Sequence, residues 1–196
     1  MRITGCLLAF LFAGTTAFGQ GAIQWSLQRR LTKDDFKGRV PLNAPSASMS
    51  WIHIETEWAC EDGTLVATAR ATFDPSQSWW RSTRGSVWGG SGERISSTQV
   101  QQDARRSALE LDMQLLEHEQ IHFDIAEATA RKIRARFAQF KNACAEAGGT
   151  EPIQQMVTEA DRELQEEQQR FDRETGNGVN PRAQDQWKQR VRALLN

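Results

Sequence analysis

The alternation of apolar and polar positions divides the chain into a strand-forming first half and a helix-forming second half. Three segments alternate with a period of two and carry β-branched or aromatic residues: 22–27, 47–58 and 64–73. Asp62-Gly63 stands between the second and third segments and favours a tight turn. We therefore expect three strands, of which the last two form an antiparallel hairpin.

The second half of the chain shows the helical period instead. A Gly/Ser-rich loop at 85–92 precedes a long helical pattern from about 101 to 144. Two further helices are predicted at about 152–173, after Gly148-Gly149, and at 181–195, beginning with Pro181. Strands followed by helices indicate an α+β fold, with a small N-terminal antiparallel sheet packed on a long helix and followed by C-terminal helices.

The first nineteen residues have the organisation of a secretory signal peptide. Arg2 precedes an apolar run at 6–13, and Ala17-Phe18-Gly19 has the small-x-small pattern of a cleavage site. The apolar run is far shorter than the roughly 20 residues that span a bilayer. We expect a signal peptide at 1–19, one domain of zincin-like fold at 20–196, a secreted or periplasmic location and no membrane association after cleavage.

Charge and cysteine content narrow the possible partners and the compartment. Lysine plus arginine (24) nearly equal aspartate plus glutamate (25), so no net field attracts nucleic acid, and we expect no nucleic-acid partner. Cleavage of the signal peptide leaves Cys60 and Cys144, an even pair in an oxidising compartment. We predict one disulfide, which would contribute about 4–5 kcal/mol in the loop-entropy model. Two separate buried thiols are the alternative.

Two of the three histidines fall in His118-Glu119-Gln120-Ile121-His122, which is the H-E-x-x-H pattern of zinc peptidases. At about 100° per helical residue the two imidazoles lie about 40° apart. They share a side of the helix with Leu111, Leu115, Ile125 and Ile133. Glu119 also turns inward, whereas the outward face carries Glu110, Glu117, Asp124 and Arg131.

Burying two imidazoles and a carboxylate is costly unless something compensates them, and a divalent cation does so directly. Zinc suits imidazole ligands at this helical spacing, so we expect Zn²⁺ bound by His118 and His122. Glu119 would then be the general base of a metal-assisted hydrolysis. A hydrogen-bonded histidine pair without metal remains the structural alternative.

Several segments resemble DUF922, a family of bacterial secreted proteins commonly labelled predicted zinc-dependent proteases. The resemblance spans 23–26 and 31–38, the more specific 115–127 around the histidine pair, and 171–178 with Gln184 and Trp187 beyond it. It implies that His118 and His122 are metal ligands and that Glu119 is the base.

The chain departs from the family at one position that bears on the metal site. The family usually has Tyr-Asp-x-x-Thr-x-His-Gly where this chain has 171–178, and Asn177 stands in place of the histidine. A carboxylate can replace a histidine as the third zinc ligand. We predict Asp172 for this role, with Glu167, Glu174 and His53 as the other candidates.

The sequence thus predicts an exported zinc-dependent peptidase that hydrolyses peptide bonds. A protein, a small peptide or a cell-wall peptide crosslink would each suit the same chemistry. The alternative is a non-catalytic envelope-binding protein that keeps the fold with a degenerate metal site, and the loss of the family histidine at Asn177 motivates it.

Overall fold

The computed structural model describes residues 21–44, 46–81, 98–140, 144 and 150–196. The expected signal peptide and the Gly/Ser-rich loop lie outside these residues. The strands are β1 (Ile23–Gln24), β2 (Ser48–Met49), β3 (Ile52–Glu61), β4 (Thr64–Phe73) and β5 (Trp79–Trp80). The helices are α1 (Thr98–Phe137), α2 (Glu151–Thr175) and α3 (Pro181–Leu195), with short 3-10 turns at Lys33–Asp35 and Ala138–Phe140.

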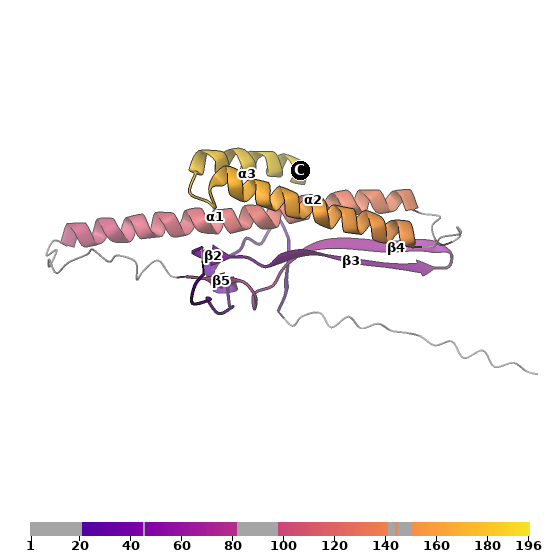
Figure 1. Ribbon diagram of the computed structural model, residues 1–196, viewed down its shortest axis with the longest axis horizontal. Coiled ribbons are helices and arrows are strands. Elements are labelled where there is room, and N and C mark those ends of the chain that lie inside the picture. Colours follow the sequence, from indigo (N-terminus) through magenta and orange to yellow (C-terminus); the bar gives the residue numbers. More distant parts are fainter. Residues whose placement is uncertain (1–20, 45, 82–97, 141–143, 145–149) are drawn as a thin grey trace, which may run out of the picture.

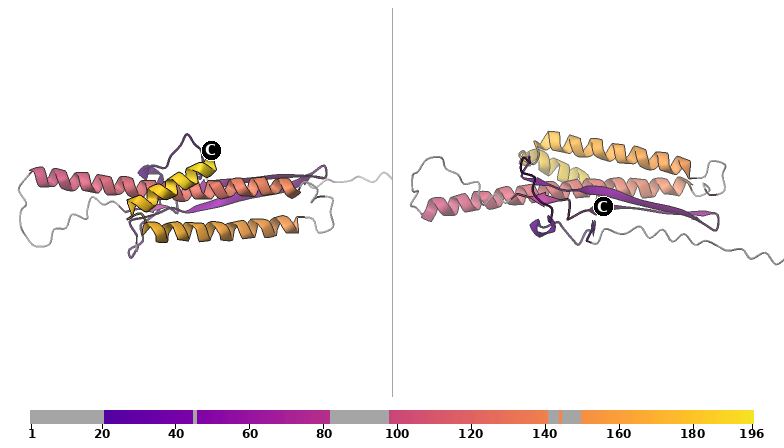
Figure 2. Two further views of the ribbon diagram at one scale, coloured as in Figure 1. Left: turned by 90° about the horizontal axis from the view of Figure 1, so that it is seen from above. Right: turned by 60° about the horizontal axis from the view of Figure 1, so that its bottom comes forward.

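The predicted α+β architecture is confirmed, and α1 is its central element. In Figure 1 the sheet lies on one side of α1 and α3 on the other, while α2 crosses in front of α1 and has its start toward the β3–β4 hairpin. The views in Figure 2 show α2 running alongside the second half of α1. Because the sheet and the later helices both pack on α1, that helix is buried on more than one face at its middle.

The hairpin forms where the sequence predicts it. β3 and β4 pair antiparallel from Ile52↔Phe73 to Glu61↔Thr64, and β1 pairs with the other edge of β4. Asp62 and Gly63 both have positive φ, 50° and 77°, as a two-residue hairpin turn of the favoured twist requires. The predicted strand at 47–58 is interrupted, however. The amide of Trp51 donates to Ser78 Oγ at 2.8 Å, so β2 pairs separately with β5 and β3 begins at Ile52.

Two apolar clusters hold the layers together. One centres on Phe73, Phe123, Phe171 and Trp187, and thereby joins the sheet, α1, α2 and α3. The other joins the far part of the hairpin to the C-terminal half of α1 and the start of α2, through Ile133, Ile153 and Val157. The predicted disulfide between Cys60 and Cys144 is formed, and it ties the turn end of β3 to the chain beyond α1.

Candidate metal centre

His118 and His122 lie one turn apart in the middle of α1, where the helix is covered by α2. Only 4% of His118 is exposed, and 13% of the His122 side chain. The His118 ring stacks on Phe171 of α2 with centroids 4.5 Å apart, and the same phenylalanine meets the His122 ring edge-on at 4.8 Å. Phe171 is itself fully buried and packs on Trp187 of α3. Both imidazoles are thus held in place by an aromatic contact.

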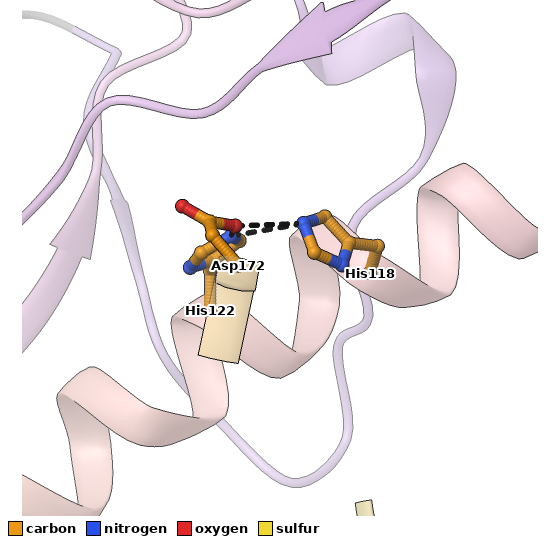
Figure 3. A group of neighbouring side chains, drawn as sticks. All are labelled: His118, His122 and Asp172. Carbon is orange, nitrogen blue, oxygen red and sulfur yellow. Dashed lines mark hydrogen bonds and ion pairs between the residues drawn. The ribbon is translucent and has the colours of Figure 1, made fainter. Parts of the chain in front are cut away.

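Asp172, the residue after Phe171, completes a compact group with the two histidines (Figure 3). Its Oδ1 lies 3.1 Å from His118 Nε2 and 2.9 Å from His122 Nε2, and the two Nε2 atoms lie 3.1 Å from each other. Neighbouring ligands of a tetrahedral zinc ion lie about 3.3 Å apart, given metal–ligand distances near 2.0–2.1 Å. The three donor atoms therefore have almost the spacing that a zinc ion requires.

The electrostatics of the group favour a cation at its centre. Burial lowers the pKa of His122, but the hydrogen bond with Asp172 and the nearby charge of Glu119 outweigh burial, and the pKa lies above its ordinary value. Burial raises the pKa of Asp172, yet its contacts with both histidines outweigh that effect and hold the pKa well below its usual range. An ionised carboxylate beside two imidazoles is a suitable ligand set for a divalent metal.

Glu119 lies in the same region and is 4% exposed, as its predicted inward direction requires. Its two carboxylate oxygens accept hydrogen bonds from the hydroxyls of Ser48, at 2.7 Å, and Ser50. Sequence reasoning missed both serines. The available signal was their spacing, because residues two apart in an extended segment point to the same side.

The other residues considered as the third ligand have different partners. Glu174 accepts from the indole of Trp187 at 2.7 Å, and Glu167 pairs with Arg170. His53 lies on β3 beside Glu55, 3.5 Å away. Of the candidates for a third ligand, the structure brings Asp172 alone to the histidine pair.

Asn177 belongs to the turn that joins α2 to α3, and Gly178 of this turn packs against His118 of the metal group, by which we mean His118, His122 and Asp172. Gly176, Asn177 and Gly178 all have positive φ, at 58°, 54° and 86°. The carbonyl of Gly178 accepts from the side chain of Gln114 on α1, so the turn is fastened one helical turn before His118. Asn177 therefore lies close to the site although it is not among the three grouped side chains.

A cleft of about 1020 Å³ opens onto the group. Residues 46–50 line one part of it, Leu111 and Leu115 of α1 another, and Gln165 and Gln169 of α2 a third, with the turn at 176–179 beside them. His118, His122, Asp172 and Glu119 all border this cleft. A ligand in the cleft would thus reach the three donor atoms and the carboxylate of Glu119 together.

The fold and this site define an α+β protein with a His-His-Asp group that could hold a metal ion. Residues 93–178 match the sequence profile of a family described as "Bacterial protein of unknown function (DUF922)", which confirms the resemblance to that family. The match contains both histidines, Glu119 and Asp172, and its description states no activity. No curated protein and no solved structure matched the chain.

Proposed function

We propose that this protein is an exported zinc-dependent peptidase, in which His118, His122 and Asp172 hold the metal and Glu119 is the general base. One observation carries the proposal: two imidazole nitrogens and one carboxylate oxygen converge within 3.1 Å of one another beside a buried glutamate in a single cleft. Three protein ligands of these types leave a coordination position open, as in catalytic rather than structural zinc sites.

The roles follow from the chemistry of peptide hydrolysis. Zinc held by these residues would supply a Lewis acid, which polarises a carbonyl group and lowers the pKa of water. As the water oxygen bonds to the carbonyl carbon, Glu119 accepts a proton, and it returns that proton to the amine nitrogen when the C–N bond breaks. The hydroxyls of Ser48 and Ser50 orient the Glu119 carboxylate from the β2 side.

The disulfide supports an exported protein, and the size of the cleft supports one that acts on peptides. The Cys60–Cys144 disulfide is typical of an oxidising compartment, in agreement with a secreted or periplasmic location. No helix among the described residues is long and apolar enough to cross a membrane. A cleft of about 1020 Å³ is large enough for several residues of a protein, a peptide or a cell-wall peptide crosslink.

A non-catalytic envelope-binding protein is the second candidate. It is favoured by the engagement of both Glu119 oxygens with serine hydroxyls, which is also the arrangement expected of a purely structural carboxylate. Under this alternative the metal group would stabilise the fold, and the cleft would bind a ligand without turning it over.

Metal analysis combined with one isosteric variant separates the two candidates. Purified protein should contain about one zinc per chain, and it should hydrolyse fluorogenic casein or a quenched-peptide library with a dependence on that zinc. Glu119→Gln should keep the zinc and lose hydrolysis, since an amide cannot accept the proton. Glu110→Gln, at an exposed position of the same helix, is the matched control and should leave both unchanged. Zinc binding with no hydrolysis of any probe would favour the second candidate.

A further inference from the structure

We propose that Gln168 is a positioning residue that fixes the imidazole proton of His122 on Nδ1, so that Nε2 is left free to bind the metal ion. The inference rests on the proposed metal site and assigns to this glutamine a role in it. Gln168 lies on α2 one helical turn before Asp172, so both side chains reach toward α1 from the same face of α2.

Two contacts between Gln168 and His122 determine the direction of each hydrogen bond. The Nε2 amide of Gln168 donates to the backbone carbonyl of His122 at 3.0 Å. A carbonyl oxygen only accepts, so the NH₂ group must face it and the Oε1 of Gln168 must be the atom beside His122 Nδ1. Because Oε1 only accepts as well, Nδ1 must carry the proton.

This proton assignment decides what the other ring nitrogen presents to the site. A neutral imidazole carries one proton, so with Nδ1 protonated the lone pair of Nε2 points outward from the ring. That lone pair faces Asp172 Oδ1 at 2.9 Å and His118 Nε2 at 3.1 Å. A lone pair directed at a carboxylate oxygen is unfavourable unless a positive charge lies between them. In metal-free protein a second proton on Nε2 supplies that charge, through the hydrogen bond with Asp172. Because Gln168 already holds a proton on Nδ1, a metal ion can take the place of the Nε2 proton.

The two histidines differ in whether Nδ1 has a hydrogen-bond partner. His118 Nδ1 is buried and has no hydrogen-bond partner within the part of the chain that the structure describes. The His118 ring is held by packing between Phe171 and the backbone of Gly178 instead. Only His122 has its tautomer selected by a hydrogen bond, so a change at Gln168 should act on His122 and spare His118.

The chemistry of glutamine suits this position for a second reason. Asp172 and Glu119 already bring two carboxylates to the site, which balance the charge of a divalent ion. A glutamate in place of Gln168 would still accept from Nδ1, but it would add a third negative charge and would lose the donor to the His122 carbonyl. Glutamine supplies the acceptor and the donor without a charge.

Three variants test the role of Gln168. Gln168→Met removes both hydrogen bonds at similar length, Gln168→Glu keeps the acceptor toward Nδ1, and Gln165→Met is the matched control at an exposed cleft position on the same helix. We expect Gln168→Met to weaken zinc binding by about 10–100-fold, as the loss of a histidine's supporting hydrogen bond typically does. Gln168→Glu should recover most of that loss, and Gln165→Met should bind zinc as the unaltered protein does.

Nitrogen-15 NMR of the imidazoles provides the readout that a purely structural role would not change. In metal-free protein, at a pH where the rings are neutral, His122 should show a protonated Nδ1 and an unprotonated Nε2. Gln168→Met should shift His122 toward a mixture of both tautomers while the His118 signals stay in place.

The result that overturns the proposal is a proton on Nε2 of neutral His122 in the unaltered protein, or zinc affinity in Gln168→Met equal to that of Gln165→Met. Neither measurement depends on hydrolysis. If the protein binds zinc with the expected tautomer but cleaves no peptide, the peptidase proposal fails and the role of Gln168 stands.

Discussion

The backbone of Gly178 lies directly against the imidazole of His118. A methyl group placed on this glycine would come within 3.2 Å of His118 Cγ and 3.3 Å of its Cβ. Since His118 is also stacked on Phe171, the ring is confined on two sides and has little room to shift. The turn after α2 therefore takes part in shaping the metal group although it contributes none of the three donor atoms.

This contact predicts that Gly178→Ala weakens zinc binding by at least about 10-fold, because the new methyl group displaces the His118 ring. The strain of φ +86° adds an unfolding cost of about 1–2 kcal/mol. Gly176→Ala is the control, since its φ of +58° is also positive while the nearest atom to its new methyl group is Val179 Cβ at 3.9 Å. Isothermal titration with zinc should separate the two variants; equal affinities would show that the contact is unimportant.

Asp172 and Asn177 should differ sharply when truncated. Asp172→Ala removes one of the three donor atoms, so we expect zinc affinity to fall by about 100-fold or more. Asn177→Ala leaves the group intact and should change affinity by less than about 3-fold. Competition with a chromophoric chelator measures both. The reverse order would make position 177, where the family usually has histidine, the true ligand position.

The serine pair should contribute measurably to stability through Glu119. Ser48→Ala removes one of the two donors to a buried carboxylate, and we expect the free energy of unfolding to fall by about 1–3 kcal/mol. In a Glu119→Ala background the same change should cost much less, because no carboxylate remains to be satisfied. Urea unfolding of the four proteins in this double-mutant cycle gives the coupling, and a coupling near zero would contradict the contact.

Asp35 should make the stability depend on pH. Burial raises the pKa of Asp35, but hydrogen bonds from Thr32 and Arg29 outweigh burial and bring the pKa below its ordinary value of 3.8. The stabilisation is therefore present at neutral pH and is lost as the pH falls below about 4 and passes through the folded-state value. Asp35→Asn should lower stability by about 1–2 kcal/mol at pH 7 and by progressively less toward pH 3. A difference between the two proteins that is constant with pH would exclude this role.

The parts of the fold predicted from sequence are those that depend on local pattern. The hairpin turn at Asp62-Gly63 and the helical histidine spacing are set by neighbours a few residues away, and both are found as predicted. Asp172 could be predicted because it lies within the segment 171–178 that resembles the family. Gln168, in contrast, meets His122 across 46 residues of sequence, and no local pattern indicates such a contact.

Two helix-face predictions were wrong for an identifiable reason. Leu111 was expected on the buried side with the histidines, yet it is 55% exposed, because it borders the open cleft instead of packing in the core. Asp124 was expected on the outward face, yet it is half-buried and accepts from the indole of Trp25 at 2.8 Å. Helical periodicity gives the relative direction of side chains, but tertiary packing decides which directions are covered.

The three donor atoms come from α1 and α2, and Asp172 lies 50 and 54 positions along the chain from His122 and His118. An unfolded chain cannot hold the three donor atoms together. An ion bound here would therefore crosslink α1 and α2 in the folded protein only. The melting temperature of the protein should then rise with the zinc concentration. Removal of zinc by a chelator should weaken the packing of α2 on α1 before any other part of the molecule.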